Sequence, residues 1–131
     1  MEEEIFRVSK NKIRAKVIRD MEKERLDDLK SEKKTYKIVE QYFEVMKGLI
    51  TALMYLDGFK TLSHKALISY MEQNYSSFFD KEEFILMDEL RKLRNDSSYY
   101  GKKVSDAFLE SKEEKIKAII NKLFSIADKK L

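Results

Sequence analysis

The stretch KKTYKIVEQYFEVMKGLITALMYL, residues 33–56, decides the fold of this chain. Its apolar side chains recur at steps of three and four residues, which is the period of an α-helix buried along a broad face. They are Ile38, Val39, Tyr42, Phe43, Met46, Leu49, Ile50, Leu53 and Met54. Gly58 follows this stretch and suits the left-handed conformation that ends many helices. We therefore predict that residues 33–56 form the central helix of a bundle.

The composition supports helices throughout. The 131 residues include no proline and only three glycines, and 43% of them are hydrophobic, which is enough for a core. There is no cysteine, so disulfides are excluded, and no apolar stretch is as long as a membrane span. The first residues are acidic, unlike a secretory signal. We expect a cytoplasmic protein without a membrane segment, and the net charge of +3 does not favour a DNA-binding surface.

Four further helices are expected around the central one. The first covers about residues 3–29 and has a thin apolar stripe, made of Ile5, Ile13, Val17, Met21 and Leu26. The others cover about residues 63–74, 80–95 and 105–127. Thr61 or Ser63 is the expected N-cap of the third helix, and Asp80 with Glu83 has the spacing of a capping box. We predict one all-α domain over residues 1–131, an antiparallel up-and-down helical bundle of about five helices.

The most informative stretch for function is ELRKLRNDSSYYGKK, residues 89–103. On the fourth helix, Leu86, Leu90 and Leu93 mark the expected core face. A neighbouring stripe begins apolar and becomes cationic, and it contains Phe84, Met87, Arg91 and Arg94. A stripe of this kind indicates a groove in which anions or carboxylates are bound.

The polar run at residues 95–98 favours caps and turns over helix interiors. We therefore expect the helix to unwind near Asn95 and to present Arg94, Asp96, Tyr99 and Tyr100 in one small volume. Cations gather in the same segment and predict a phosphate site; they are Arg91, Lys92, Arg94, Lys102 and Lys103. Of these residues, we assign phosphate binding to Arg91, Arg94 and Lys102, together with Asn95.

This segment resembles the signature of HEPN domains, in which an arginine, commonly followed by asparagine, precedes a histidine by a few residues. The resemblance covers about residues 33–124, with Arg94 and Asn95 at the first two positions. It implies a symmetric dimer with a composite cleft and a metal-independent RNA endonuclease in which the arginine stabilises the transition state. It also implies a two-component module of the toxin–antitoxin type, in which a small nucleotidyltransferase can modify a motif tyrosine with AMP.

The departure from the family pattern is that Tyr99 or Tyr100 stands where the histidine belongs. The pKa of tyrosine lies near 10, about three units from the value that suits a base at neutral pH. Arg94, Tyr99 and Tyr100 are therefore the catalytic candidates, while RNase chemistry is expected to be slow or lost. No cofactor is expected, and one histidine without cysteine does not favour a zinc site.

Plainer interpretations stay open. Arg91 and Arg94 could pair with Asp88 or Glu89 on the helix surface, and the two tyrosines could simply pack a loop onto the bundle. His64 begins the third helix, where it could approach the cleft or serve only as a structural contact. The alternative function is a non-catalytic interaction module that binds a partner protein or a nucleotide.

Overall fold

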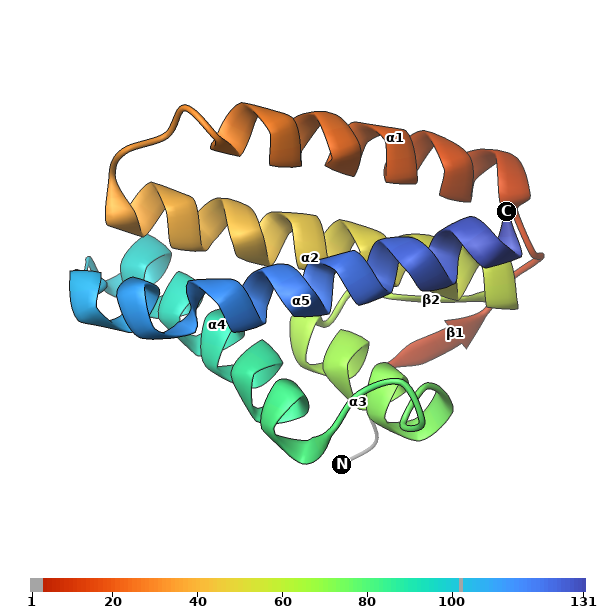
Figure 1. The fold of residues 1–131 in the computed structure, drawn as a ribbon. Helices are drawn as coiled ribbons and strands as arrows, with labels where there is room; N and C mark the ends of the chain where they lie inside the picture. Colours follow the sequence, from red (N-terminus) through yellow and green to blue (C-terminus); the bar gives the residue numbers. More distant parts are fainter. Residues whose placement is uncertain (1–3, 102) are drawn as a thin grey trace.

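A computed structural model describes residues 4–101 and 103–131. This part of the chain contains five α-helices and two short strands, shown in Figure 1. In chain order they are β1 (Ile5–Arg7), α1 (Lys12–Leu29), α2 (Thr35–Asp57), β2 (Phe59–Thr61), α3 (His64–Asn74), α4 (Lys81–Tyr100) and α5 (Asp106–Lys130). The prediction of an all-α bundle is confirmed.

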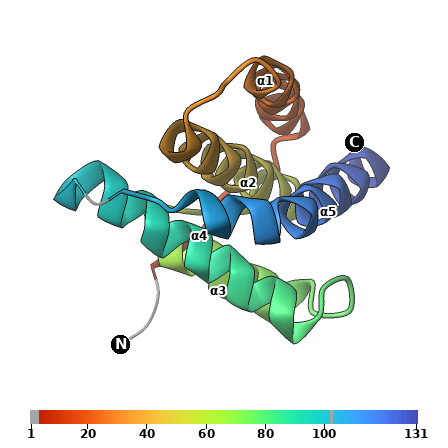
Figure 2. The same ribbon diagram turned by 60° about the vertical axis from the view of Figure 1, so that its left-hand side comes forward.

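α2 lies at the centre of the bundle, as its broad apolar face predicts. α1 and α5 run along it, while α3 and α4 cross below it in the view of Figure 1, and Figure 2 shows the same arrangement from another side. Half of the largest fully buried side chains come from α2, among them Phe43, Met46, Leu49 and Leu53. The other helices are therefore positioned by packing against α2 or against helices that contact α2.

The helix directions depart from a simple up-and-down order. α1 and α2 are antiparallel, but α5 runs parallel to α2 (Figure 1). Polar contacts fix this parallel register at both ends and in the middle: Thr35 with Asp106, Tyr42 with Glu113, and Asp57 with Lys130. The reason is topological, because α3 and α4 together carry the chain back to the end of the molecule at which α2 began.

The chain is not helical over residues 4–11, and the prediction of a helix over residues 3–29 is wrong on this point. Residues 5–7 form β1, which pairs antiparallel with β2 in the register Ile5 to Thr61. α1 begins at Lys12, after the Asn11 side chain caps it by accepting a hydrogen bond from the Arg14 amide at 2.9 Å. The strand has an edge to pair with because Gly58, at φ 92°, ends α2 and turns the chain into β2.

Three members of the predicted inner stripe of this segment face solvent instead, while Ile5 and Leu26 are partly buried against the core. Ile13, Val17 and Met21 are 81%, 54% and 51% exposed, whereas Ala15 and Leu29 are buried against the bundle together with Glu22. Gly48 on α2 explains the rotation, because a Cβ there would lie 2.2 Å from Glu22 Oε2. The absent side chain makes room for a carboxylate, so the helix packs through a face that hydrophobicity alone does not reveal.

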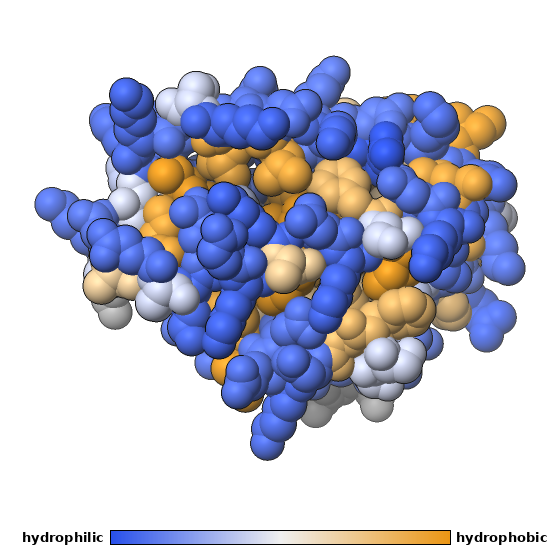
Figure 3. Space-filling model, in the orientation of Figure 1, coloured by the Kyte–Doolittle hydropathy of each residue, from blue (hydrophilic) through white to orange (hydrophobic). Residues whose placement is uncertain are grey.

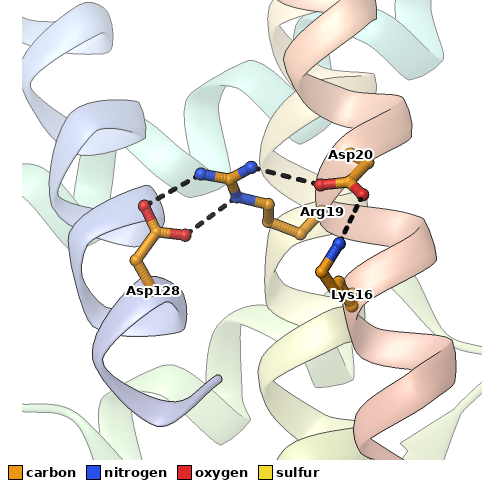
Figure 4. A network of polar contacts seen from close by, with 4 residues as sticks. All are labelled: Lys16, Arg19, Asp20 and Asp128. Atoms are coloured by element: carbon orange, nitrogen blue, oxygen red, sulfur yellow. Dashed lines mark hydrogen bonds and ion pairs between the residues drawn. The ribbon is translucent and has the colours of Figure 1, made fainter.

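α1 and α5 are bridged by one well-formed ion pair. Arg19 donates from Nε to Asp128 Oδ1 at 2.8 Å and from Nη2 to Oδ2 at 3.1 Å, as Figure 4 shows. Further along, the two helices border a groove of about 540 Å³ whose lining includes Leu26, Ile38 and Ile120. Figure 3 shows apolar side chains at the surface between these helices. No helix in residues 4–101 or 103–131 is long and apolar enough to cross a membrane.

Asp57 joins three elements where α2 ends. The hydroxyls of Tyr70 and Tyr75 each donate to its Oδ2 at 2.6 Å, and Lys130 Nζ lies 3.0 Å from its Oδ1. The three donors come from α3, from the residue that follows α3, and from the last turn of α5. One carboxylate therefore fixes the ends of three helices relative to one another.

Candidate anion-binding site

α4 carries the candidate arginines on a well-started helix. The Asp80 side chain accepts a hydrogen bond from the Glu83 amide at 2.8 Å, and the Glu83 side chain accepts one from the Asp80 amide at 3.0 Å, so the predicted capping box is confirmed. Leu86 and Leu90 are buried, and so is Met87, the second member of the mixed stripe. The next members of that stripe, one and two turns after Met87, are Arg91 and Arg94.

Arg94 reaches back to the central helix. Its guanidinium carbon lies 5.9 Å from the centre of the Phe43 ring on α2, a distance typical of a cation–π contact, and its Nε atom is buried. Because α2 is the fixed centre of the bundle, this contact holds the guanidinium beside a rigid aromatic ring. Arg94 is therefore positioned by the fold.

His64 contacts the same ring. Ser63 is the N-cap of α3, and its side chain accepts a hydrogen bond from the Ala66 amide at 3.1 Å. Of the two predicted caps, Thr61 and Ser63, the second is therefore confirmed. His64 is the first residue of α3, and its imidazole lies 5.3 Å from the Phe43 ring in an edge-on arrangement. The only histidine of the chain and the motif arginine thus share one aromatic contact.

The pKa of His64 is lowered from its usual value of 6.5. Burial of the imidazole is the main cause, and the positive charges of Lys47 and Arg94 add to it. The nearby carboxylate of Glu44 acts in the opposite direction. The imidazole is consequently neutral at pH 7, which is the form that accepts a proton.

Three other cations near the site, Lys47, Arg91 and Lys92, are paired with carboxylates. Lys47 Nζ lies 3.0 Å from Glu44 Oε2, one turn apart on α2. On α4, the Asp88 carboxylate forms two ion pairs: its Oδ1 lies 2.8 Å from Arg91 Nε, and its Oδ2 lies 3.3 Å from Lys92 Nζ. The interpretation that Arg91 pairs with Asp88 is therefore confirmed. A phosphate would meet a site in which positive charge is present but already balanced in part.

The end of α4 differs from the prediction. The helix does not unwind at Asn95 but continues to Tyr100 and ends at Gly101, at φ 66°. Asp96 is thus rotated by about 200° from Arg94 around the helix and leaves the arginine's face. The polar residues are accommodated because a glycine in the left-handed conformation terminates the helix only after them.

Three candidate positions lie wholly or partly outside the described residues. The backbone of Tyr99 and Tyr100 belongs to α4, but their side chains are not described, and Lys102 falls in the gap between residues 101 and 103. Asn95 is half-buried next to Arg94. Of the predicted site residues, the structure therefore brings Arg91 and Arg94 to one face of α4.

Sequence reasoning missed Lys47 and Glu44. A signal was available, since Lys47 follows Phe43 by one helical turn and so lies beside any group that contacts the ring. Among the side chains that the structure describes, no group of three or more His, Asp or Glu residues could hold a metal ion. What the site offers chemically is a neutral imidazole, a guanidinium and balanced flanking charges.

Comparison of the chain with protein-family models, with curated proteins and with solved structures gives no match.

Proposed function

We propose that the chain is a HEPN-like domain that binds RNA or a nucleotide through a phosphate at Arg94 and cleaves RNA without a metal. The single observation that carries the proposal is that His64 and Arg94 lie against the same Phe43 ring. A proton acceptor and an anion binder are thereby held next to each other by two different helices. This is the pair of groups that the motif of the family supplies from one segment.

Arg94 suits the phosphate because its planar guanidinium can donate two parallel hydrogen bonds to neighbouring phosphate oxygens. Lys47 and Arg91 are close enough to act on the pKa of His64, so their charges also reach a ligand bound beside the imidazole. Each of them is paired with a carboxylate, at 3.0 Å and 2.8 Å. A bound phosphate competes with Glu44 and Asp88 for these two cations.

The cleavage step follows from the two groups. The neutral imidazole of His64 takes the proton of the ribose 2′-hydroxyl, and the 2′-oxygen attacks the adjacent phosphorus. The bond from phosphorus to the 5′-oxygen breaks, and the leaving oxygen takes a proton from water. The protonated His64 then returns its proton to the hydroxide that this leaves, and a 2′,3′-cyclic phosphate remains. Arg94 stabilises the negative charge that develops on the non-bridging oxygens.

In this proposal His64 takes the role of the histidine that the motif lacks. Tyr99 and Tyr100 are then free for a second role that the resemblance implies, namely orientation of the phosphate or modification by a nucleotidyltransferase partner in a toxin–antitoxin module. A cytoplasmic setting and a homodimer belong to the same proposal.

The alternative is a non-catalytic module that binds a partner protein or a nucleotide. The observation in its favour is the pairing of Arg91 and Lys92 with Asp88, because a cation already held by a carboxylate has less to gain from a phosphate. The two functions differ in one measurable property, which is cleavage of RNA by the purified protein.

The test is incubation of mixed RNA with the protein in EDTA, alongside measurement of RNA binding. We expect Arg94→Ala to lose binding and cleavage, and His64→Gln to retain binding while cleavage slows by roughly a hundredfold or more. Lys60→Ala, which removes an exposed cation on β2, is the matched control and is expected to behave as the wild type.

Because the His64 pKa is lowered, the loss of cleavage in acidic solution is expected at a lower pH than an unperturbed histidine would give. Binding without cleavage by the wild type selects the non-catalytic alternative. Equal RNA binding by the wild type and Arg94→Ala would contradict the proposal that Arg94 binds the phosphate of RNA.

A further inference from the structure

A groove runs between α3 and α4, which lie side by side in Figures 1 and 2. Its volume is about 910 Å³. The lining side chains follow one another at helical steps on both walls: Lys65, Ser69 and Glu72 on α3, and Phe84, Asp88 and Lys92 on α4. The groove is therefore large enough for a ligand of nucleotide size.

The groove opens at the candidate anion-binding site. Lys65 on its α3 wall directly follows His64, and Asp88 on its α4 wall forms the ion pair with Arg91 at 2.8 Å. The charge of Arg91 is in turn one of the causes that lower the pKa of His64. A ligand that is bound by Arg94 beside His64 can therefore continue directly into the groove.

Positive charge is in excess where the groove opens. Lys65 and Lys92 are exposed on opposite walls. Asp88 is shared by Lys92 and Arg91, at 3.3 Å and 2.8 Å, and among the described side chains Lys65 has no ion-pair partner. One carboxylate therefore accompanies three cations. Such an excess favours an anion, and lysine and arginine are the side chains that bind the phosphates of nucleic acids.

Away from its opening, the groove is lined by apolar side chains. Phe84 is half-buried and packs against Phe79, with 5.7 Å between the ring centres, and Ile85 is 57% exposed. Glu72 lies on the α3 wall about two helical turns beyond Lys65, and its charge disfavours a further phosphate there. An uncharged base suits this part of the groove, because bases stack on aromatic side chains and cover apolar surface.

We propose that this groove is a subsite for the nucleotide next to the one whose phosphate binds Arg94. Lys65 and Lys92 bind the neighbouring phosphate of the strand, and the base of that nucleotide lies on Phe84 and Ile85. The proposal rests on the proposed function, because it takes the ligand of the site to be RNA. It adds that the strand is single at this place, since a base that is stacked and paired in a duplex cannot reach the groove.

The salt dependence of binding tests the two lysines. The probe is a fluorescein-labelled oligouridine with 2′-O-methyl groups, which cannot be cleaved, and binding is measured by anisotropy at several salt concentrations. We expect Lys65→Ala and Lys92→Ala each to weaken binding and to reduce the slope of log K against log salt by about 0.7, the value for one phosphate contact to a single strand. Lys115→Ala on α5 is the matched control, because Lys115 is 60% exposed and Lys92 is 66% exposed. Slopes for both variants that equal the slope for the control would overturn the proposal.

The place of the base is tested by Phe84→Leu, which keeps an apolar side chain and removes the ring. We expect its affinity for the same oligonucleotide to fall by about tenfold. Its affinity for a matched abasic oligonucleotide, which has the phosphates without the bases, is expected to equal that of the wild type. Equal losses for the two probes would show that Phe84 acts only through the fold, and would overturn the base subsite.

The subsite and the proposed function fail in different ways. Weaker binding by Arg94→Ala, with wild-type affinity and slope in both lysine variants, would retain the proposed function and overturn the subsite. Wild-type binding by Arg94→Ala, with weaker binding by Lys65→Ala and Lys92→Ala, would contradict the proposed function while supporting the groove as a place where RNA binds.

Discussion

α1 and α5 both pack along α2, but they are held by different kinds of contact. α5 buries a long apolar set against the core: Leu109, Ile116, Ile119, Ile120, Leu123, Ile126 and Ala127. α1 buries only Ala15, Leu29 and the charged Glu22. The comparison teaches that one helix is attached by a large apolar area and the other by a small contact built around one buried carboxylate.

The fit of α1 depends on a polar cluster at its centre. Glu22 is 5% exposed and accepts a hydrogen bond from Arg25 Nε at 2.9 Å, while Arg25 Nη1 donates to Gln41 at 3.3 Å. A buried charge is tolerated only when it is paired in this way. The attachment of α1 is therefore expected to be more sensitive to small changes in side chains than the attachment of α5. Four predictions test this contrast, from the largest expected effect to the smallest.

The largest effect is expected on the α5 side. Leu123 is fully buried, so Leu123→Ala removes apolar contacts and leaves a cavity. We expect the free energy of unfolding, measured by urea denaturation, to fall by about 2–5 kcal/mol. Leu62→Ala, at a residue that is 82% exposed, is the control and is expected to change it by less than about 0.5 kcal/mol.

On the α1 side, Gly48→Ala tests the space above Glu22. In most helix interiors this change stabilises by up to about 1 kcal/mol. Here the new Cβ would lie 2.2 Å from Glu22 Oε2 and 2.6 Å from its Cγ, so we expect a loss of about 1–3 kcal/mol instead. In a variant that also carries Glu22→Ala the clash is absent, so Gly48→Ala should cost less stability there than in the wild type. A stabilising Gly48→Ala would show that α1 is not held by this fit.

A smaller effect is expected from pH. Burial raises the pKa of Glu22, so the folded state binds its proton more tightly than the unfolded state. The contribution of Glu22 to stability is then largest below the unfolded pKa and declines as pH rises through the raised folded value. Glu22→Gln should therefore gain stability relative to the wild type as pH increases over this window, in urea titrations at a series of pH values.

Asp20 provides the matched control for this pH effect on the same helix. Its hydrogen bonds with Arg19 and Lys16 lower its pKa, which is the opposite shift. Asp20→Asn should therefore lose stability relative to the wild type as pH rises. The same pH trend for both variants would contradict the assignment to Glu22.

The smallest effect concerns the bridge between the two helices. The side chains of Arg19 and Asp128 are 29% and 45% exposed, and ion pairs in such positions contribute little. We expect a double-mutant cycle with Arg19→Ala and Asp128→Ala to give a coupling energy below about 1 kcal/mol, and added salt should reduce it. A larger, salt-insensitive coupling would mean that α1 is held to α5 more than to α2.

The same contrast explains what the sequence could predict. α2 was identified with its Gly58 terminus because a broad apolar face and a glycine each have a direct local meaning. The sequence pattern assigns the inner face of α1 to Ile5, Ile13, Val17, Met21 and Leu26. For Ile13, Val17 and Met21 this prediction is wrong, because the true contact is a carboxylate beneath a glycine. Such a contact depends on two residues that are far apart in the chain, so a local sequence pattern cannot predict it.

For the site, the arginines of α4 were identified from their place on a mixed stripe. The predicted unwinding near Asn95 was wrong, because the preference of polar residues for caps was outweighed by the helix end at Gly101. The proximity of His64 to Arg94 was left open, since it depends on both side chains contacting Phe43. Local chemistry was readable from the sequence, while the meeting of three helices was not.

The parallel register of α2 and α5 has a consequence for how the chain folds. Tyr42 and Glu113, like Thr35 and Asp106, are 71 residues apart in sequence. Folding rates decline as the average sequence separation of native contacts grows, because long loops must close before such contacts form. The chain should therefore fold more slowly than a bundle in which each helix pairs with the next, and α5 should be the last helix to gain its native contacts during synthesis.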